Sequence, residues 1–160
     1  MIPRDAAIGR LLRTAHLGRL LWRRLRRPVT LGCRAIVADE HGAVLLVRHS
    51  YVAGWHLPGG GIGRGETLAQ VTARELREET GIEAAGPLRL HGLFLRQRHG
   101  NSDHVAVHVV EHWRGEVRAD GLEISDAGFF PSAALPDETT PATRRRIEEW
   151  LGRRPVAEHW

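Results

Sequence analysis

The stretch from Gly60 to Ile82 constrains the fold of this chain more than any other. It joins a glycine-rich segment to a run in which Glu75, Glu78 and Glu79 stand at positions i, i+3 and i+4. On an α-helix these carboxylates crowd one face within about one turn. Like charges at this spacing cost an isolated helix about 0.5 kcal/mol per pair, so a helix that keeps three usually places a cation among them. Oxygen-only ligands point to Mg²⁺ or Mn²⁺.

The residues around the acidic run predict how this helix is used. Ala69, Ala73, Leu76 and Thr80 recur every three or four residues and form a small-to-apolar stripe apart from the acidic one. We therefore expect the helix to pack by one side while its carboxylates face a cleft. Gly81 suits a left-handed C-terminal cap. The preceding loop is rich in glycine, so its backbone can approach a ligand closely.

The same stretch resembles the Nudix box at every fixed position. The matching residues are Gly60, Glu66, Arg74, Glu75, Leu76, Glu78, Glu79, Gly81 and Ile82. An acidic run alone is usually a solvated helix face, but this set of identities arises by chance less than about once in a million. The order of elements extends the resemblance over residues 29–151. It implies a Nudix-type α/β/α sandwich with a mixed sheet, which periodicity alone would not predict.

The resemblance also implies a metal site. In family terms Glu78 and Glu79 match the principal ligands of Mg²⁺, and Mn²⁺ is the alternative ion. Glu75 matches a position that acts as ligand or as general base in different members, so both roles stay open. The carbonyl of Gly60 matches a further ligand in several members. All three glutamates are therefore candidate catalytic residues.

Supporting residues are expected on both sides of the box. Glu66 and Arg74 match family positions that support the loop and orient the catalytic glutamates. A carboxylate outside the box is common in the family, and Glu123 in the segment LEISDAGFF is our first candidate for it. Asp126 and Glu111 are weaker candidates. The competing interpretation of Glu123 is an ordinary acid in a surface loop.

The reaction implied is hydrolysis of a nucleoside diphosphate linked to another group, by attack of water on phosphorus. Divalent metal held by carboxylates suits this chemistry, which needs neutralised phosphate oxygens and a positioned water. Family signatures for ADP-ribose, dinucleoside polyphosphate, coenzyme A and NADH are missing, which leaves nucleoside triphosphates, deoxynucleoside triphosphates or small nucleotide derivatives. The alternative is a non-catalytic domain that senses a nucleotide. The three retained glutamates argue against it.

Several cationic or flexible positions are candidates for binding the substrate. Arg48 ends a predicted strand near the glycine loop, where it is either a phosphate ligand or a surface charge. Arg96 and Arg98 make the segment from Arg96 to Asp103 cationic, and that segment is either a hairpin tip or a substrate lid. Gly59 joins this set because it belongs to the loop.

The chain divides into a basic segment, residues 1–28, and a predicted Nudix hydrolase domain, residues 29–160. Residues 6–27 carry seven arginines and no acid, at spacing that predicts an amphipathic helix. Packing on the domain or on a second subunit as a homodimer, binding to nucleic acid or an anionic membrane, and a processed targeting segment all remain open. Arginines interrupt every apolar run well before the length of about 18 residues that a membrane span needs.

Composition agrees with a single soluble domain. All 23 basic residues are arginines, and the net charge of +4 mildly favours anionic substrates. Cys33 is the only cysteine, so a reducing compartment, the cytoplasm, is expected.

The remaining elements follow from pattern. Residues 29–38 and 43–47 are predicted strands that form a hairpin around a turn at 39–42. Two more strands are expected at 88–95 and 104–113, and a strand end at 129–131. A last helix is expected over 140–151, with Thr140 as its N-cap and Pro141 at its first position.

Overall fold

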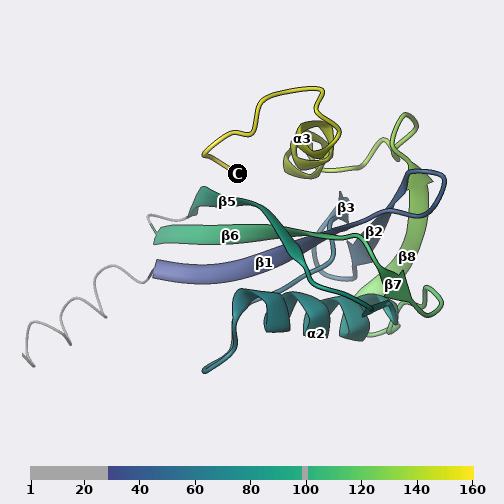
Figure 1. Ribbon diagram of the computed structural model, residues 1–160, viewed down its shortest axis with the longest axis horizontal. Helices are drawn as coiled ribbons and strands as arrows, with labels where there is room; N and C mark the ends of the chain where they lie inside the picture. The colour runs from purple at the N-terminus through teal and green to yellow at the C-terminus, as the bar shows by residue number, and fades with distance from the viewer. Residues whose placement is uncertain (1–28, 99–100) are drawn as a thin grey trace, which may run out of the picture.

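The computed structural model describes residues 29–98 and 101–160. The predicted N-terminal helix, and with it the boundary between residues 28 and 29, lies outside this range. Two helices, α2 (Leu68–Thr80) and α3 (Pro141–Trp150), cover opposite faces of a layer of strands, as Figure 1 shows. The predicted α/β/α sandwich is therefore confirmed.

The strands form two three-stranded sheets and one short pair. In the first sheet the order is β1 (Val29–Val37), β6 (Asn101–Val110) and β5 (Arg89–Arg98). In the second it is β3 (Trp55–His56), β2 (Ala43–His49) and β8 (Ile124–Pro131). The pair is β4 (Glu83–Ala84) with β7 (Trp113–Arg114). Strand β1 runs parallel to β6, whereas the other pairs are antiparallel, so the arrangement is mixed as expected.

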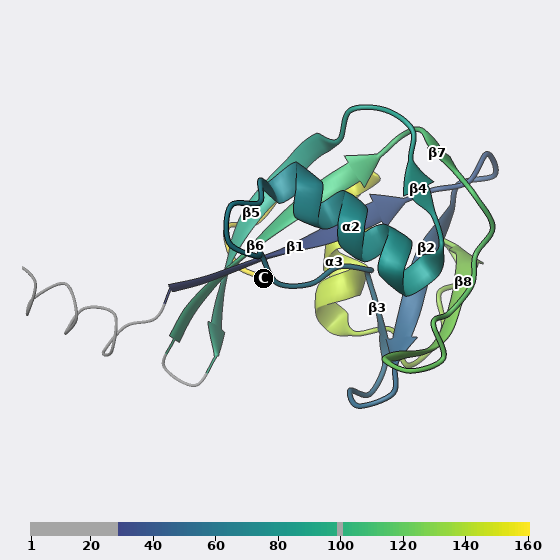
Figure 2. The same ribbon diagram turned by 90° about the horizontal axis from the view of Figure 1, so that it is seen from below.

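The core lies on both faces of the strands because side chains alternate along them. Ile36 and Val44 face α3, where they pack with Ile147. Ala35 and Leu45, each one position away, face α2 with Leu76, Ile82 and others. A period of two in the strands thus supplies apolar contacts to each helix in turn. Figure 2 shows α2 lying across β1, β5 and β6.

The predicted hairpin of residues 29–47 is wrong in its pairing. The turn after β1 forms, and Asp39 accepts hydrogen bonds from the amides of His41 and Ala43. Beyond a single bridge between Ala38 and Val44, however, the two strands separate into different sheets. Strand β1 pairs with β6 and β2 pairs with β8, and each of these partners lies more than seventy positions away in the sequence, where no local pattern reveals it.

The segment from Arg96 to Asp103 is also more regular than expected. Strands β5 and β6 continue through it to Arg98 and Asn101, with Arg96 directly opposite Asp103. The described part of this segment is therefore a pair of antiparallel strands.

Both helix ends follow the expected chemistry. Gly81 caps α2 with φ of 73°, and Thr140 accepts a hydrogen bond from the amide of Thr143 at 3.3 Å at the start of α3. A capping box between Thr67 and Gln70, which the sequence analysis did not identify, begins α2.

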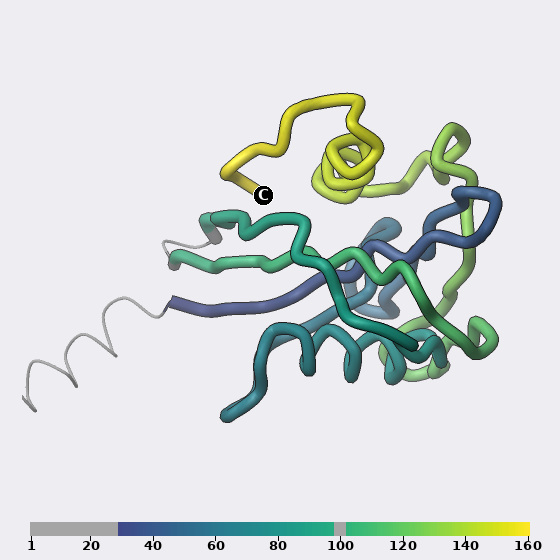
Figure 3. Tube along the Cα trace, in the orientation of Figure 1, coloured from purple at the N-terminus to yellow at the C-terminus, as the bar shows by residue number. Residues whose placement is uncertain are grey.

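The C-terminal tail returns to the sheet after α3, as the trace in Figure 3 shows. The amide of Leu95 donates to the carbonyl of Glu158 at 2.9 Å, and the amide of Trp160 donates to the carbonyl of Leu95 at 3.0 Å. The tail is thereby fixed along β5. Within the described ranges, neither helix has the length and apolar content to cross a bilayer.

Candidate active site

The glycine loop lies directly against strand β1. The amide of Cys33 donates to the carbonyl of Gly60 at 2.9 Å, and the amide of Ala35 donates to the carbonyl of Pro58 at 2.8 Å. Gly59 has φ of 141°, and a β-carbon on it would collide with the backbone carbonyl of Cys33. Only glycine fits there, so the loop's position depends on it.

Two of the three box glutamates contact consecutive glycines of this loop. The amide of Gly59 donates to Oε2 of Glu79 at 2.7 Å. A β-carbon on Gly60 would lie 2.5 Å from the carboxylate of Glu75, so this carboxylate fills the space that glycine leaves. The acidic face of α2 therefore packs against the loop and does not simply face solvent.

A single guanidinium, that of Arg74, binds three carboxylates of the box. It donates to Oε1 of Glu66 at 2.8 Å, to Glu75 at 2.8 Å and to Glu78 at 3.0 Å. Glu66 also accepts from the amide of Gly63 at 2.7 Å, which ties this network to the loop. Arg74 therefore places a positive charge among three carboxylates of the box. Its hydrogen bond to Glu66, followed by that of Gly63, lowers the pKa of Glu66.

The stripe predicted for packing is only partly right. Leu76 and Thr80 are fully buried as expected, but Val71 and Thr72 are buried as well, and Glu79 is only 6% exposed. Burial raises the pKa of Glu79 to about 7. The amide of Gly59 and the charge of Arg34 oppose this shift, whereas the charges of Glu75 and Glu123 add to it.

Whether this site suits a metal ion depends on the atoms that its side chains offer as ligands. Glu75, Glu78 and Glu79 offer only oxygen, the chemistry that Mg²⁺ and Mn²⁺ prefer. Across residues 29–98 and 101–160, however, no three acidic, histidine or cysteine side chains converge as a ready metal cluster. Arg74 binds Glu75 and Glu78, and the amide of Gly59 binds Glu79. The metal and catalytic roles of Gly60 and of the three glutamates remain predictions, as do the supporting roles of Glu66 and Arg74.

An arginine that the sequence analysis missed lies beneath the loop. Nη1 of Arg34 donates to the carbonyl of Leu57 at 3.0 Å and to that of Gly59. Burial lowers its pKa. The signal was present, since Arg34 interrupts the otherwise apolar run LGCRAIV.

Arg34 also borders a cavity of about 290 Å³ beside the loop. Gly60 and Gly61 line the same cavity, together with Arg96 and Asp103. A phosphate there would meet the loop's backbone and two guanidinium groups, of which that of Arg96 is paired with Asp103. This is the cavity nearest the box carboxylates among those described.

The predicted substrate residues have different surroundings. Arg96 lines this cavity while it pairs with Asp103. Arg48 instead forms an ion pair with Glu138 at 2.6 Å. Gly59 uses its amide and its carbonyl within the protein. The side chain of Arg98 lies outside the described part of the structure.

The three candidates for a carboxylate ligand outside the box lie at different places relative to the glycine loop. Glu123 is exposed in the loop before β8, and its charge acts on Glu79. Asp126 is exposed on β8 opposite Arg48. Glu111 follows the far end of β6, whereas Gly61 lies beside Gly32 near the start of β1. Glu123 therefore remains the candidate for a metal ligand, and Glu111 is remote from the loop.

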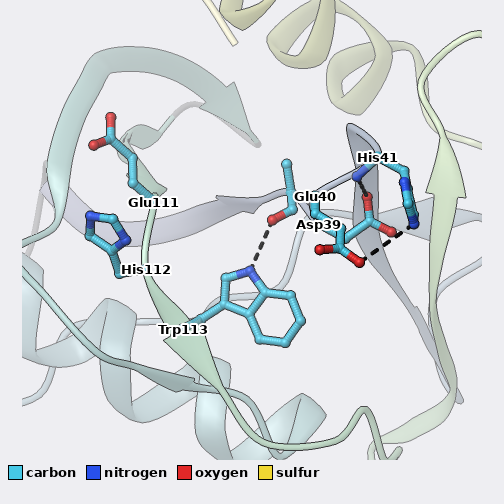
Figure 4. A pocket seen from close by; sticks show the side chains of 7 residues that line it. Asp39, Glu40, His41, Glu111, His112 and Trp113 are labelled. Atoms are coloured by element: carbon cyan, nitrogen blue, oxygen red, sulfur yellow. Dashed lines mark hydrogen bonds and ion pairs between the residues drawn. The ribbon is translucent and has the colours of Figure 1, made fainter.

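Glu111 instead lines a cavity of about 490 Å³ at the β1–β2 turn, shown in Figure 4. Its floor is Trp113, whose indole nitrogen donates to the carbonyl of Ala38 at 2.9 Å. The acids around it have partners: Asp39 accepts from turn amides, and Glu111 pairs with Arg89 at 2.9 Å. These contacts serve the turn and the strand ends, so we do not assign the chemistry to this cavity.

Comparison with known proteins decides the family. The profile of the NUDIX domain matches residues 28–151 of this chain. This chain belongs to the Nudix family. The relatives below are named as a diphosphatase and as hydrolases, and with the domain match they support a Nudix pyrophosphohydrolase.

Two relatives illustrate the range of the family. A Bacillus subtilis protein named provisionally as an 8-oxo-dGTP diphosphatase is 31% identical over 76% of this chain and 79% of its own length. The protein named NAD-capped RNA hydrolase NudC of Vibrio vulnificus is 31% identical over 81% of this chain, which spans only 50% of that relative.

Solved structures agree with the Nudix fold. The MutT NUDIX hydrolase of Burkholderia pseudomallei superimposes with a TM-score of 0.69 at 26% identity, over 76% of this chain and 98% of that one. The E. coli ORF135 protein gives a TM-score of 0.66 at 26% identity, over 82% and 96% of the two chains.

Proposed function

We propose that this Nudix domain hydrolyses the pyrophosphate bond of a nucleoside or deoxynucleoside triphosphate, or of a small nucleotide derivative, with Mg²⁺ as its cofactor and Mn²⁺ as a substitute. The observation that carries the proposal is the placement of Glu75 and Glu79 against Gly60 and Gly59. The acidic face of α2 thus meets the loop that lines a cavity bordered by Arg34 and Arg96. Carboxylates for a cation and arginines for a phosphate therefore lie around the same loop.

The residues divide the work between them. Glu75, Glu78 and Glu79 would hold the metal, with Glu123 as a further carboxylate whose charge already acts on Glu79. When bound, such a metal neutralises phosphate oxygens and lowers the pKa of an attacking water. Glu75 serves as ligand or as general base.

The arginines have two separate tasks in this proposal. Arg34 and Arg96 bind the phosphate oxygens from the strand side of the cavity. Arg74 fixes the side chains of Glu75 and Glu78, so that the carboxylates do not have to be ordered when the substrate arrives. Gly59 holds Glu79 in the same way through its amide.

The names of two relatives support a triphosphate as the proposed substrate. The match to the relative named as an 8-oxo-dGTP diphosphatase covers 79% of that relative's length. The match to the NudC relative covers only 50% of that relative's length. We therefore place triphosphates, oxidised purine triphosphates included, ahead of NAD-linked substrates. The cytoplasm is the proposed compartment, since the only cysteine is a buried free thiol.

A substrate screen tests this function directly. The full chain is incubated with each nucleoside and deoxynucleoside triphosphate, with 8-oxo-dGTP, NAD and nucleotide sugars, in Mg²⁺ or Mn²⁺ and in EDTA. We expect metal-dependent turnover that is fastest with a triphosphate. Release of pyrophosphate or of phosphate then identifies the bond that breaks. A folded protein that cleaves none of these compounds in either metal would overturn the proposal.

A further inference from the structure

The loop that carries Glu123, residues 120–124, is exposed but firmly held. Oδ1 of Asp120 accepts hydrogen bonds from the amides of Leu122 and Ile124, both at 2.8 Å. A carboxylate that accepts from its own backbone two residues on fixes a turn. The side chain of Leu122 is 83% exposed, so burial of apolar surface does not hold this part of the loop. Its conformation depends instead on the hydrogen bonds of Asp120.

Ser50, at the end of β2, holds the same loop from the other side. The amide of Ser50 donates to the carbonyl of Glu123 at 2.8 Å, and its hydroxyl donates to the carbonyl of Leu122 at 3.0 Å. Ile124, the next residue along the chain, is fully buried and stands opposite His49 in the sheet. The backbone that carries Glu123 is therefore fixed on both of its sides.

This placement brings the charge of Glu123 to bear on Glu79. Burial raises the pKa of Glu79 most, and the charges of Glu75 and Glu123 add to that shift. A second carboxylate held close to a buried one costs free energy unless a cation lies between them. A loop that only connected two strands would gain nothing from such a position.

The β1–β2 turn shows the same local motif apart from the acidic helix. Oδ1 of Asp39 accepts from the amides of His41 and Ala43 at 2.9 and 2.8 Å, which are again the residues two and four positions on. Glu40 in this turn is exposed and lies 3.6 Å from the imidazole of His41. The motif by itself is therefore a means of fixing a turn. What distinguishes Asp120 is the carboxylate that its loop carries.

We propose that Asp120 and Ser50 are positioning residues of the active site, which keep the carboxylate of Glu123 beside that of Glu79 so that the two can share a cation. This deepens the proposed function and rests on it, because it takes Glu123 as the further metal ligand and assigns the residues that hold it in place. Asp120 and Ser50 act through the backbone of the loop and not as ligands. A loop that is already ordered spares the site the entropy of ordering a carboxylate when the cation binds.

The test measures Mn²⁺ affinity directly, so it does not depend on turnover. The full chain is titrated with Mn²⁺, and the free ion is counted by electron paramagnetic resonance. Asp120→Ala removes the acceptor, whereas Asp120→Asn keeps an oxygen that can accept from both amides and removes only the charge. Asp39→Ala, the same loss in the β1–β2 turn, is the matched control. Melting temperatures show that each variant is folded.

We expect Asp120→Ala to weaken Mn²⁺ binding about tenfold, the smaller of the losses typical of groups that orient a metal ligand. Asp120→Asn should bind Mn²⁺ almost as tightly as the unchanged chain, and so should Asp39→Ala even if its melting temperature falls. An equal loss in Asp120→Asn and Asp120→Ala would make Asp120 itself a ligand. An equal loss in Asp120→Ala and Asp39→Ala would make the effect one of general stability. Either result would overturn the proposal.

A second pair of variants tests Ser50. Ser50→Ala removes the hydroxyl bond to Leu122 but keeps the amide bond to Glu123, so a smaller loss of Mn²⁺ affinity is expected than in Asp120→Ala. The control is Ser125→Ala, whose hydroxyl also joins β8 to β2, through the carbonyl of Arg48 at 3.0 Å. Equal effects of the two serine changes would reject the role of Ser50.

Glu123→Gln shows whether Asp120 acts through Glu123. This change alone should weaken Mn²⁺ binding, and adding Asp120→Ala to it should cause no further loss, because the group that Asp120 positions is already gone. Mn²⁺ affinity that is undiminished in Glu123→Gln, or a second loss as large as in the unchanged background, would overturn the proposal. Failure of the unchanged chain to bind Mn²⁺ would overturn it too.

These measurements also separate the inference from the proposed function. A chain whose Mn²⁺ affinity falls in Asp120→Ala but not in Asp39→Ala, and which hydrolyses no nucleotide, would refute the hydrolase and keep the positioning role. A chain that hydrolyses nucleotides, and whose Mn²⁺ affinity is the same with and without Asp120→Ala, would do the reverse.

Discussion

Arg74 and Arg146 each bind glutamates on their own helix, but Arg74 is partly exposed to solvent whereas Arg146 is buried. Arg74 on α2 has a side chain that is 32% exposed, and it binds Glu75 and Glu78. Arg146 on α3 is fully buried, and it binds Glu149 at 2.6 Å. Its guanidinium also lies 3.9 Å from the ring centroid of Phe94.

The difference shows how one kind of pair serves two purposes. A partly exposed pair exchanges partners at little cost, because water solvates each charge when the pair opens. A buried pair cannot open without leaving a charge unsolvated. The arrangement on α2 therefore suits a site that must admit a cation, whereas the one on α3 joins the helix, β5 and the tail permanently.

The largest effect is expected from breaking the buried pair. Arg146→Met leaves the carboxylate of Glu149 buried beside His91 and should lower the free energy of unfolding by about 3–5 kcal/mol. The double variant Arg146→Met, Glu149→Leu removes both charges and should recover most of that loss. Urea denaturation measures both. If Arg146→Met lowered the free energy of unfolding by less than about 1 kcal/mol, the buried pair of Arg146 would contribute no more to stability than the partly exposed pairs of Arg74.

Glu78→Gln should have the largest effect on catalysis. It removes a charge from a proposed metal ligand that is half exposed, so we expect turnover to fall at least about a hundredfold while the melting temperature stays the same. The control is Glu116→Gln, an exposed glutamate outside the network. Undiminished hydrolysis by Glu78→Gln in Mg²⁺ would count decisively against the assigned site.

Arg74→Gln should affect the metal more than the fold. Stability should change by less than about 1 kcal/mol, because the pairs are partly exposed. The Mg²⁺ concentration for half-maximal activity should rise about tenfold, since Glu75 and Glu78 lose the group that orients them. Arg77→Gln, on an exposed face of the same helix, is the control. A large fall in melting temperature without a change in Mg²⁺ dependence would make Arg74 a structural residue like Arg146.

The smallest effect is expected from His108, which is buried as Arg146 is. Burial lowers its pKa, and Thr72 contacts its Nδ1 at 2.9 Å. Below about pH 6.5 the unfolded chain binds a proton at His108 more readily than the folded chain does, so this residue destabilises the fold increasingly as the pH falls. Between pH 6 and pH 5 its share is at most about 1.4 kcal/mol. Urea denaturation at pH 6 and at pH 5 should show that the free energy of unfolding falls less between these values in His108→Gln than in the unchanged chain. An equal fall in both proteins would refute this account.

Local sequence patterns predicted the helices and strands better than they predicted which strands pair with each other. The ends of α2 and α3 depend on residues within one turn, so Gly81, Thr140 and Pro141 were identified correctly. The pairing of β1 with β6 joins residues about seventy positions apart, and the sequence analysis placed β1 with β2 instead. Alternation of apolar residues fixes which side chains are buried, but not which strand lies alongside.

The sequence by itself determined the family, the acidic helix and the loop before it, because the spacing of a few glycines and glutamates is a local property of the chain. Only the tertiary structure decided that Glu79 is buried against Gly59 and that Arg34 lies beneath the loop. It also decided that Trp160 returns to line a cavity beside the start of α3. Those outcomes depend on contacts between segments that fold together from distant parts of the chain. Burial and the surrounding charge, which set the chemistry of each side chain, exist only once those segments have packed.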